Sequence, residues 1–141
     1  MAINSCKGNK RAYSINPRGG YYHLSLQFDQ DTEVYQSCSL QWKNHYYVFG
    51  GNLGKSGGQR HVSMLNGNRL GRKGTLIFDF SYGACTVLNQ LNIVLCFGKH
   101  GEYNVCRESN NPLGLFTKLP KSAKYHRQTR IASFDGKNTI Y

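Results

Sequence analysis

The side chains best suited to chemistry in this 141-residue chain are five cysteines and seven carboxylates. Cys96 and Cys106 lie at equal distances from Gly101, so a hairpin that folds symmetrically about this glycine would place them opposite each other. Cross-strand neighbours have Cβ atoms about 4.5–5.5 Å apart, which is near disulfide range. The spacing therefore favours a disulfide. The alternative is a pair of buried thiols, because free cysteine packs as a small hydrophobe.

A second pair of cysteines, Cys38 and Cys85, occupies equivalent positions of an internal repeat described below. We expect these two to be small core residues and not a bonded pair. No CxxC or HxxxH spacing is present, so no metal site is predicted. A disulfide would belong to an oxidising compartment, which slightly favours an extracellular location over the cytoplasmic alternative.

Motifs for catalysis are missing from the sequence. It contains no GxSxG, HExxH or Walker A pattern, and its carboxylates are too scattered to reveal the pair that glycosidases use. The segment GNLGKSGG, residues 51–58, has the wrong Gly-to-Lys spacing for a phosphate-binding loop and better fits a long hairpin loop. We predict a protein that is not an enzyme and needs no cofactor.

The charge of the chain is strongly positive, with 18 Lys and Arg against 7 Asp and Glu and a formal net charge of +11. Such a balance favours acidic partners, although it can also serve only the solubility of a β-rich surface. Motifs for specific nucleic-acid recognition are absent, and no apolar run is long enough for a membrane-spanning helix. The charge therefore indicates a protein partner with an acidic surface, with a polyanionic glycan as the alternative.

The elements that must position these residues read as short β-strands. Runs such as HYYVF at 45–49, TLIFDF at 75–80 and NIVLCF at 92–97 are apolar and are bounded by Gly, Asn or Lys. Regularly spaced runs of this kind predict an all-β protein. The dipeptides NG at 66–67 and DG at 135–136 predict tight turns.

These runs recur with a period near 47 residues. Cys38 aligns with Cys85, and YYVFG at 46–50 aligns with IVLCFG at 93–98. A further shift places RIASFDGKNTIY at 130–141 over QSCSLQWKNHYY at 36–47. A repeat of this length with four short strands has the size of one β-propeller blade.

From residue 37 to residue 141 the chain resembles the kelch repeat. The Gly-Gly of that family is matched by Gly50-Gly51 and, less well, by Phe97-Gly98. LFTKLP at 115–120 matches its Trp-x-x-Leu-Pro element with a Phe for the Trp, whereas the first unit has TLIFDF instead. The resemblance implies antiparallel four-stranded blades of an incomplete β-propeller, about two to three in number, and a role in protein interaction. The family's Tyr on the second strand is matched by Tyr47 and Tyr141.

The resemblance divides the chain into four parts. Residues 1–36 would form the end of a preceding blade or an irregular segment, with an outer strand at 21–28. Residues 37–82 and 83–129 would each form a blade with strands a to d, and 130–141 would begin another. Glycines 50, 51, 98 and 136 are expected at turns. Because Tyr141 falls within a strand, we expect a fragment of a larger propeller, with completion by other copies as the alternative.

The predicted site lies on the loops that join strands b to c and d to a, because these emerge at one end of antiparallel blades. The function predicted for this site is a non-enzymatic protein-interaction module that presents basic loops to an acidic partner. Polyanion binding, to glycan or nucleic acid, and a structural role in an extracellular protein are the alternatives. The opposite end, with a c–d turn expected over 66–74, offers less surface. The predicted partner-binding residues are Lys55, Arg60, His61, Lys99, His100, Lys121, Lys124, His126, Arg127 and Arg130.

Overall fold

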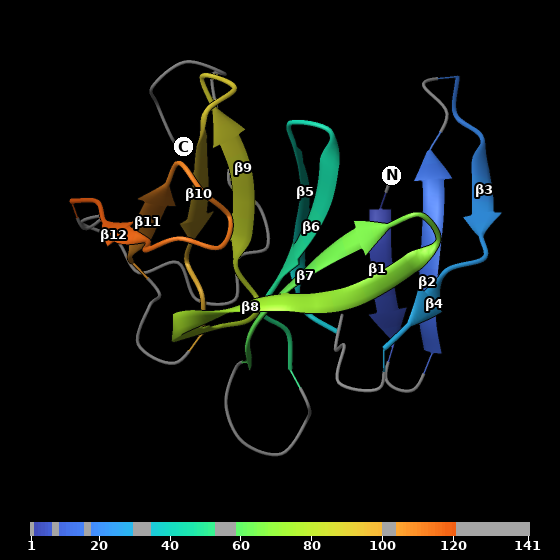
Figure 1. Ribbon diagram of the computed structural model, residues 1–141, viewed down its shortest axis with the longest axis horizontal. Coiled ribbons are helices and arrows are strands. Elements are labelled where there is room, and N and C mark those ends of the chain that lie inside the picture. Colours follow the sequence, from blue (N-terminus) through green and yellow to red (C-terminus); the bar gives the residue numbers. More distant parts are fainter. Residues whose placement is uncertain are drawn as a thin grey trace.

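The computed structural model describes residues 2–6, 9–15, 18–29, 35–52, 59–99 and 104–120, and in the first two ranges only Tyr13 has a described side chain. Every regular element in these residues is a β-strand, and the strands form three separate sheets (Figure 1). The predicted all-β class and the antiparallel sheets are confirmed. No sheet formed by these strands closes on itself.

The N-terminal sheet is an antiparallel meander of β1 (Ala2–Cys6), β2 (Asn9–Ile15) and β3 (Tyr21–Leu24). The single strand predicted over 21–28 is wrong, because the chain turns after β3 and forms the separate strand β4 (Gln27–Phe28). The amide of Leu26 donates to the carbonyl of Leu24 at 3.0 Å, a three-residue γ-turn that ends β3. As a result, β3 and β4 belong to different sheets.

The second sheet has the strand order β4-β8-β7-β6-β5. Its last four strands form the expected a-b-c-d meander, and β4 adds a fifth strand that runs parallel to β8. The predicted NG turn is confirmed, since Gly67 has a φ of 57° between paired Asn66 and Arg69. The long c–d turn expected over 66–74 is wrong, because β8 begins directly after this tight turn. The four strands are β5 (Cys38–Trp42), β6 (His45–Phe49), β7 (Gln59–Asn66) and β8 (Arg69–Phe80).

The third sheet repeats the same meander in the order β12-β11-β10-β9. Its outer strand, β12, is much shorter than β8, and its third strand, β11, begins at Cys106. Residues 130–141, predicted to begin another blade, lie outside the described residues. The four strands are β9 (Ala84–Leu88), β10 (Asn92–Cys96), β11 (Cys106–Ser109) and β12 (Thr117–Lys118).

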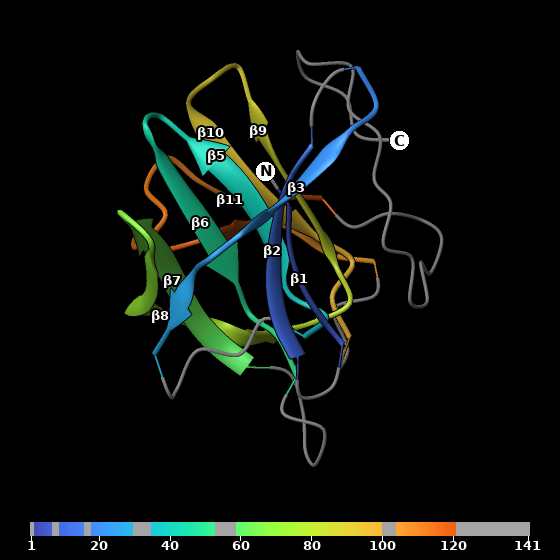
Figure 2. The ribbon, with the colours of Figure 1, turned by 90° about the vertical axis from the view of Figure 1, so that its right-hand side faces the viewer.

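An apolar cluster shared by the second and third sheets forms the main core. Phe116, which was predicted to match a tryptophan of the kelch repeat, is 2% exposed and packs edge-on against Phe49 and Phe78 at ring distances of 6.0 and 6.2 Å. The opposite face of the second sheet packs Val48 and Leu70 against the segment around β3 and β4. The three sheets therefore follow one another in chain order, from right to left in Figure 1, and Figure 2 views them from the side of the N-terminal sheet, with the others behind it.

Tyr47 is an interior member of this core on β6. It is 5% exposed, lies edge-on to Trp42 and stacks on Phe49, with ring centroids 6.4 and 6.3 Å apart. Burial raises the pKa of the Tyr47 phenol above its ordinary value of 10.0, because the anion would lose its hydration. The side chain therefore stays neutral in the folded protein to a higher pH than in the unfolded chain.

This shift predicts a loss of stability in alkali. Above pH 10 the unfolded chain releases the Tyr47 proton while the folded protein retains it, so the free energy of unfolding falls as pH rises through this window. We expect Tyr47→Phe to show a shallower fall than the parent protein when urea midpoints are measured from pH 9 to pH 11. Tyr22→Phe is the control, since Tyr22 is 62% exposed. An identical slope for Tyr47→Phe and the parent would contradict the prediction.

Candidate functional site

The candidate site lies at one end of the second and third sheets. At this end β6 leads towards β7, β8 leads into β9, and β10 leads towards β11; we call it the loop end. In the second sheet the amide of Gly50 donates to the carbonyl of His61 at 2.8 Å, and the amide of Gly51 donates to that of Phe80 at 2.9 Å. The amide of Gln59 in turn donates to the carbonyl of Gly51 at 2.8 Å. These bonds tie the Gly-Gly segment to both β7 and the end of β8.

Further hydrogen bonds connect the two sheets at the loop end. The amide of Tyr82 donates to the carbonyl of Gln36 at 2.9 Å, and Asn52 Nδ2 donates to Gln36 Oε1 at 2.8 Å. The amide of Lys99 donates to the carbonyl of Ser81 at 2.8 Å. Because both sheets contribute to this network, the loop end is one frame and not two independent sets of loops.

The backbone of this frame is strained in a way that repeats between the sheets. Gln36 and Tyr82 have φ values of 58° and 59°. Each lies two residues before the first strand of its meander, which is β5 for Gln36 and β9 for Tyr82. Gly50 and Phe97 have φ values of 66° and 60° and directly follow β6 and β10. The amide of Gly50 donates to His61 on β7, and that of Phe97 donates to Val105, directly before β11. A left-handed residue with a Cβ costs about 1 kcal/mol, and such residues gather at ligand sites.

Gly98 was predicted to provide the turn after the second strand of the later repeat. The structure assigns the left-handed conformation to Phe97 and not to Gly98. Phe97 is 5% exposed and packs with Leu88 and Val94, so its side chain is held by the core although its backbone is strained. Gly50 and Gly51 both have positive φ, as predicted, while Gly136 lies outside the described residues.

Three of the predicted partner-binding residues are described, and all three lie at the loop end. Arg60 is half exposed, and its Nε lies 2.8 Å from Asp79 Oδ1, which partly neutralises its charge. Lys99 Nζ lies 5.1 Å from the centre of the Tyr82 ring, a cation–π contact that leaves the net charge in place. His61 follows Arg60 on β7 and is partly buried. The other predicted residues, Lys55, His100, Lys121, Lys124, His126, Arg127 and Arg130, lie outside the described ranges.

The loop end also contains buried polar atoms that sequence reasoning missed. Ser81 is fully buried, and neither its Oγ nor Gln59 Oε1 has a hydrogen-bond partner among the residues that the structure describes. An unpaired buried polar atom typically costs about 1–3 kcal/mol, so each such atom needs an explanation. No sequence signal could have identified them, because burial of a Ser or Gln depends on which loops meet.

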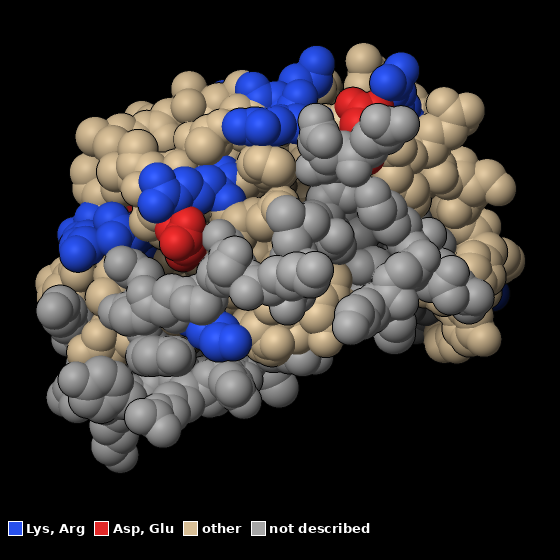
Figure 3. Space-filling model, turned by 90° about the horizontal axis from the view of Figure 1, so that it is seen from below, with Lys and Arg blue, Asp and Glu red and all other residues tan. Residues whose placement is uncertain are grey.

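The basic residues at the opposite end of β8 are arranged differently. Arg69 Nε lies 2.6 Å from Asp29 Oδ1, and Arg72 Nη2 donates to Thr75 Oγ1 at 2.7 Å. They belong to β8 and do not form the loop expected over 66–74. Seen from below, Lys and Arg side chains form a broken band in which two groups of acidic atoms lie against basic ones (Figure 3).

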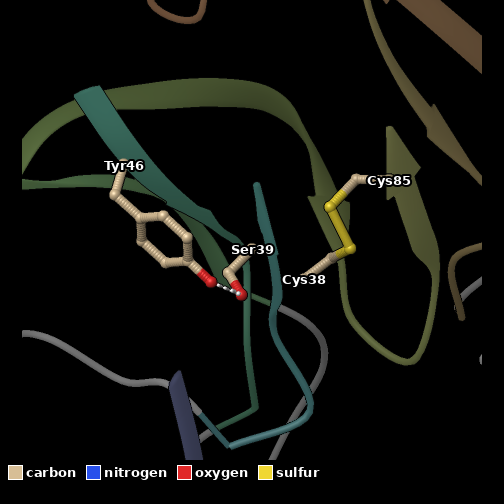
Figure 4. Close-up of a disulfide and its surroundings, with 4 residues drawn as sticks. All are labelled: Cys38, Ser39, Tyr46 and Cys85. Atoms are coloured by element: carbon tan, nitrogen blue, oxygen red, sulfur yellow. Dashed lines mark hydrogen bonds between the residues drawn. A yellow bond between two sulfur atoms is a disulfide. The ribbon is translucent and has the colours of Figure 1, made fainter. Parts of the chain in front are cut away.

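The two described disulfides give one confirmation and one correction. Cys96 and Cys106 are direct cross-strand partners with Cα atoms 4.1 Å apart, so the predicted disulfide is confirmed. Cys38 and Cys85 are also bonded, with Cα atoms 5.9 Å apart, so their interpretation as unpaired core residues is wrong (Figure 4). When two repeats pack through their inner strands, equivalent positions meet, and the 47-residue spacing was itself the signal for this bond.

Among the described residues no group of His, Cys, Asp and Glu could hold a metal ion. No helix in the described part of the chain is long and apolar enough to cross a membrane.

Comparisons with known proteins leave the family open. No protein-family model matches the chain, and no curated protein matches it. The resemblance to kelch repeats therefore stays a prediction carried by the residues themselves.

Proposed function

We propose that this chain is part of a kelch-type β-propeller that acts as a non-enzymatic protein-interaction module. Two consecutive four-strand meanders in the same order, each with left-handed residues before its inner strand and after its second, support this proposal. The Cys38–Cys85 bond between strands 47 residues apart supports it as well, since it joins equivalent positions. Two disulfides are typical of proteins in oxidising compartments, which favours an extracellular setting.

The partner of this module is an acidic protein surface that docks at the loop end. The observation that carries this proposal is the fixed position of Lys99, whose backbone is bonded to Ser81 and whose amine rests on the Tyr82 ring. A pre-positioned cation loses little entropy on binding, which favours recognition over diffuse attraction. Arg60 lies on the same frame, although Asp79 partly neutralises it, just as Asp29 pairs with Arg69 at the other end of β8.

Charge reversal tests this proposal. With a Glu/Asp-rich peptide as the probe, we expect Arg60→Glu with Lys99→Glu to weaken binding about tenfold or more at 150 mM salt. The control is Arg72→Glu with Lys73→Glu, which makes the same change in net charge on exposed β8 residues and should weaken binding about twofold. Fluorescence anisotropy measures both affinities.

Equal losses in the two double variants would mean unspecific charge attraction and would contradict a site at the loop end. Heparin and single-stranded DNA serve as probes for the polyanion alternative. If these bind more tightly than the acidic peptide, with affinity falling steeply as salt is raised, the polyanion function would replace the proposed one.

A further inference from the structure

A groove lies at the opposite end of the second sheet, where the a–b and c–d turns emerge; we call this the turn end. Its volume is about 430 Å³, within the range of small-molecule sites. It lies between the start of β6 and the end of β7, and Tyr46 and Leu65 on its floor are direct cross-strand partners. The residues that carry the argument are Gln41, Asn44, His45, Tyr46, Leu65 and Asn66.

The third sheet has a second groove in the corresponding place, with a volume of about 300 Å³. It includes Asn92 at the start of β10 and Ser109 at the end of β11, together with Asn110, Leu115 and Thr117. A hydrogen bond joins the turn after β5 to the turn after β9: Trp42 Nε1 of the second sheet donates to the carbonyl of Leu91 in the third at 2.8 Å. Both grooves therefore lie at the turn end of sheets that this bond joins, and each includes the start of a second strand and the end of a third.

The side chains of both grooves are polar but almost uncharged. Of the described residues, those lining the first groove include three carboxamides and no Lys, Arg, Asp or Glu. Those lining the second include two carboxamides, two hydroxyls and the carboxylate of Glu108. None of the described residues that line either groove is Lys or Arg. Each carboxamide both donates and accepts hydrogen bonds, which suits a ligand whose groups do the same.

The aromatic part of the first groove is pre-positioned. The Tyr46 hydroxyl and Ser39 Oγ lie 2.8 Å apart, and Figure 4 shows Ser39 pointing to Tyr46 while neighbouring Cys38 points to the disulfide. A ring beside several carboxamides offers one apolar surface and a set of hydrogen bonds to the same ligand.

The position of the groove favours a compact ligand over an extended peptide. β6 and β7 are interior strands, and each is paired on both sides at the positions that border the groove. A peptide strand adds to an exposed sheet edge, and neither β6 nor β7 offers one within the groove. We propose that the two grooves bind neutral saccharides, with the first groove as the main site.

This inference does not depend on the proposed function at the loop end. The experiment is ligand-observed NMR with the intact chain and a panel of glucose, galactose, mannose, N-acetylglucosamine and their neutral disaccharides. We expect saturable binding of at least one of these sugars, weakened about tenfold by Gln41→Ala with His45→Ala. Gln90→Ala, an exposed turn residue outside both grooves, should leave the affinity unchanged.

Tyr46→Phe is a milder variant that keeps the test informative if the Gln41→Ala/His45→Ala protein does not fold. It keeps the ring and removes only the hydroxyl that contacts Ser39, so a folded protein with several-fold weaker binding is expected. Amide spectra of each variant report whether the sheets are intact. No binding of any neutral sugar, or equal affinities in the Gln41→Ala/His45→Ala and Gln90→Ala proteins, would overturn the proposal. Binding of sulfated sugars alone would assign the interaction to charge and not to these grooves.

Discussion

Removal of the Cys38–Cys85 disulfide is expected to lower the free energy of unfolding by about 4 kcal/mol. The bond closes a loop over a sequence separation of 47 residues, whereas Cys96–Cys106 closes one of 10. A disulfide lowers the entropy of the unfolded chain, and this effect grows with the length of the loop that the bond closes. The Cys96–Cys106 bond should therefore contribute less, about 3 kcal/mol. Cys38→Ala with Cys85→Ala should therefore be the less stable of the two double variants.

Guanidinium unfolding of both variants and the parent, under oxidising conditions, measures these differences. Cys6→Ser is included in all three proteins, so that exchange with the fifth cysteine does not alter the pairing. Peptide mapping without reduction verifies which cysteines are joined. The prediction fails if mapping finds Cys38 and Cys85 as free thiols, or if loss of Cys96–Cys106 destabilises the protein more than loss of Cys38–Cys85.

The disulfides also illustrate which features could be predicted from the sequence. Cys96–Cys106 depends on one hairpin, whose symmetry about Gly101 follows from residue spacing alone. Cys38–Cys85 depends on how two sheets pack, and their inner strands β5 and β9 are not hydrogen-bonded neighbours. Because Cys38 and Cys85 occupy equivalent positions of the repeat, they were expected to be similar core residues without a bond. Repeats that pack through their inner strands bring such positions together, which allows the disulfide.

The same distinction holds for the strands and the sites. The strands of each meander followed from apolar runs and turn residues, which are local signals, whereas their order was implied by the resemblance to kelch repeats. The break between β3 and β4 did not, because Leu24, Leu26 and Phe28 remain in one apolar cluster across the γ-turn and so resemble one continuous strand. The basic residues of the loop end could be predicted, because each loop is rich in Lys and Arg in the sequence itself. The grooves of the turn end could not, because their carboxamides come from separate strands and turns and form no contiguous motif.

Gly50→Ala is expected to destabilise the protein by about 3–5 kcal/mol. Gly50 has a φ of 66°, and a Cβ there would lie 1.8 Å from the carbonyl oxygen of Phe80. That oxygen also accepts the amide of Gly51 at 2.9 Å, so relief of the overlap would separate β6 from the end of β8 and loosen the loop end. The strand HYYVF is followed by glycine for this reason. Another residue could adopt the left-handed backbone conformation, as Phe97 does, but a residue with a Cβ could not lie so close to the Phe80 carbonyl.

Gly67→Ala provides the matched control for this prediction. Gly67 has a similar φ of 57°, but a Cβ there would meet no atom within 4 Å. Its replacement should therefore show only the backbone effect, about 1 kcal/mol. Thermal and urea unfolding of both variants separates steric overlap from conformational strain, because the second contribution is common to them. Similar losses for Gly50→Ala and Gly67→Ala would mean that Phe80 yields to the added methyl group, and the loop end would then be less rigid than its hydrogen bonds indicate.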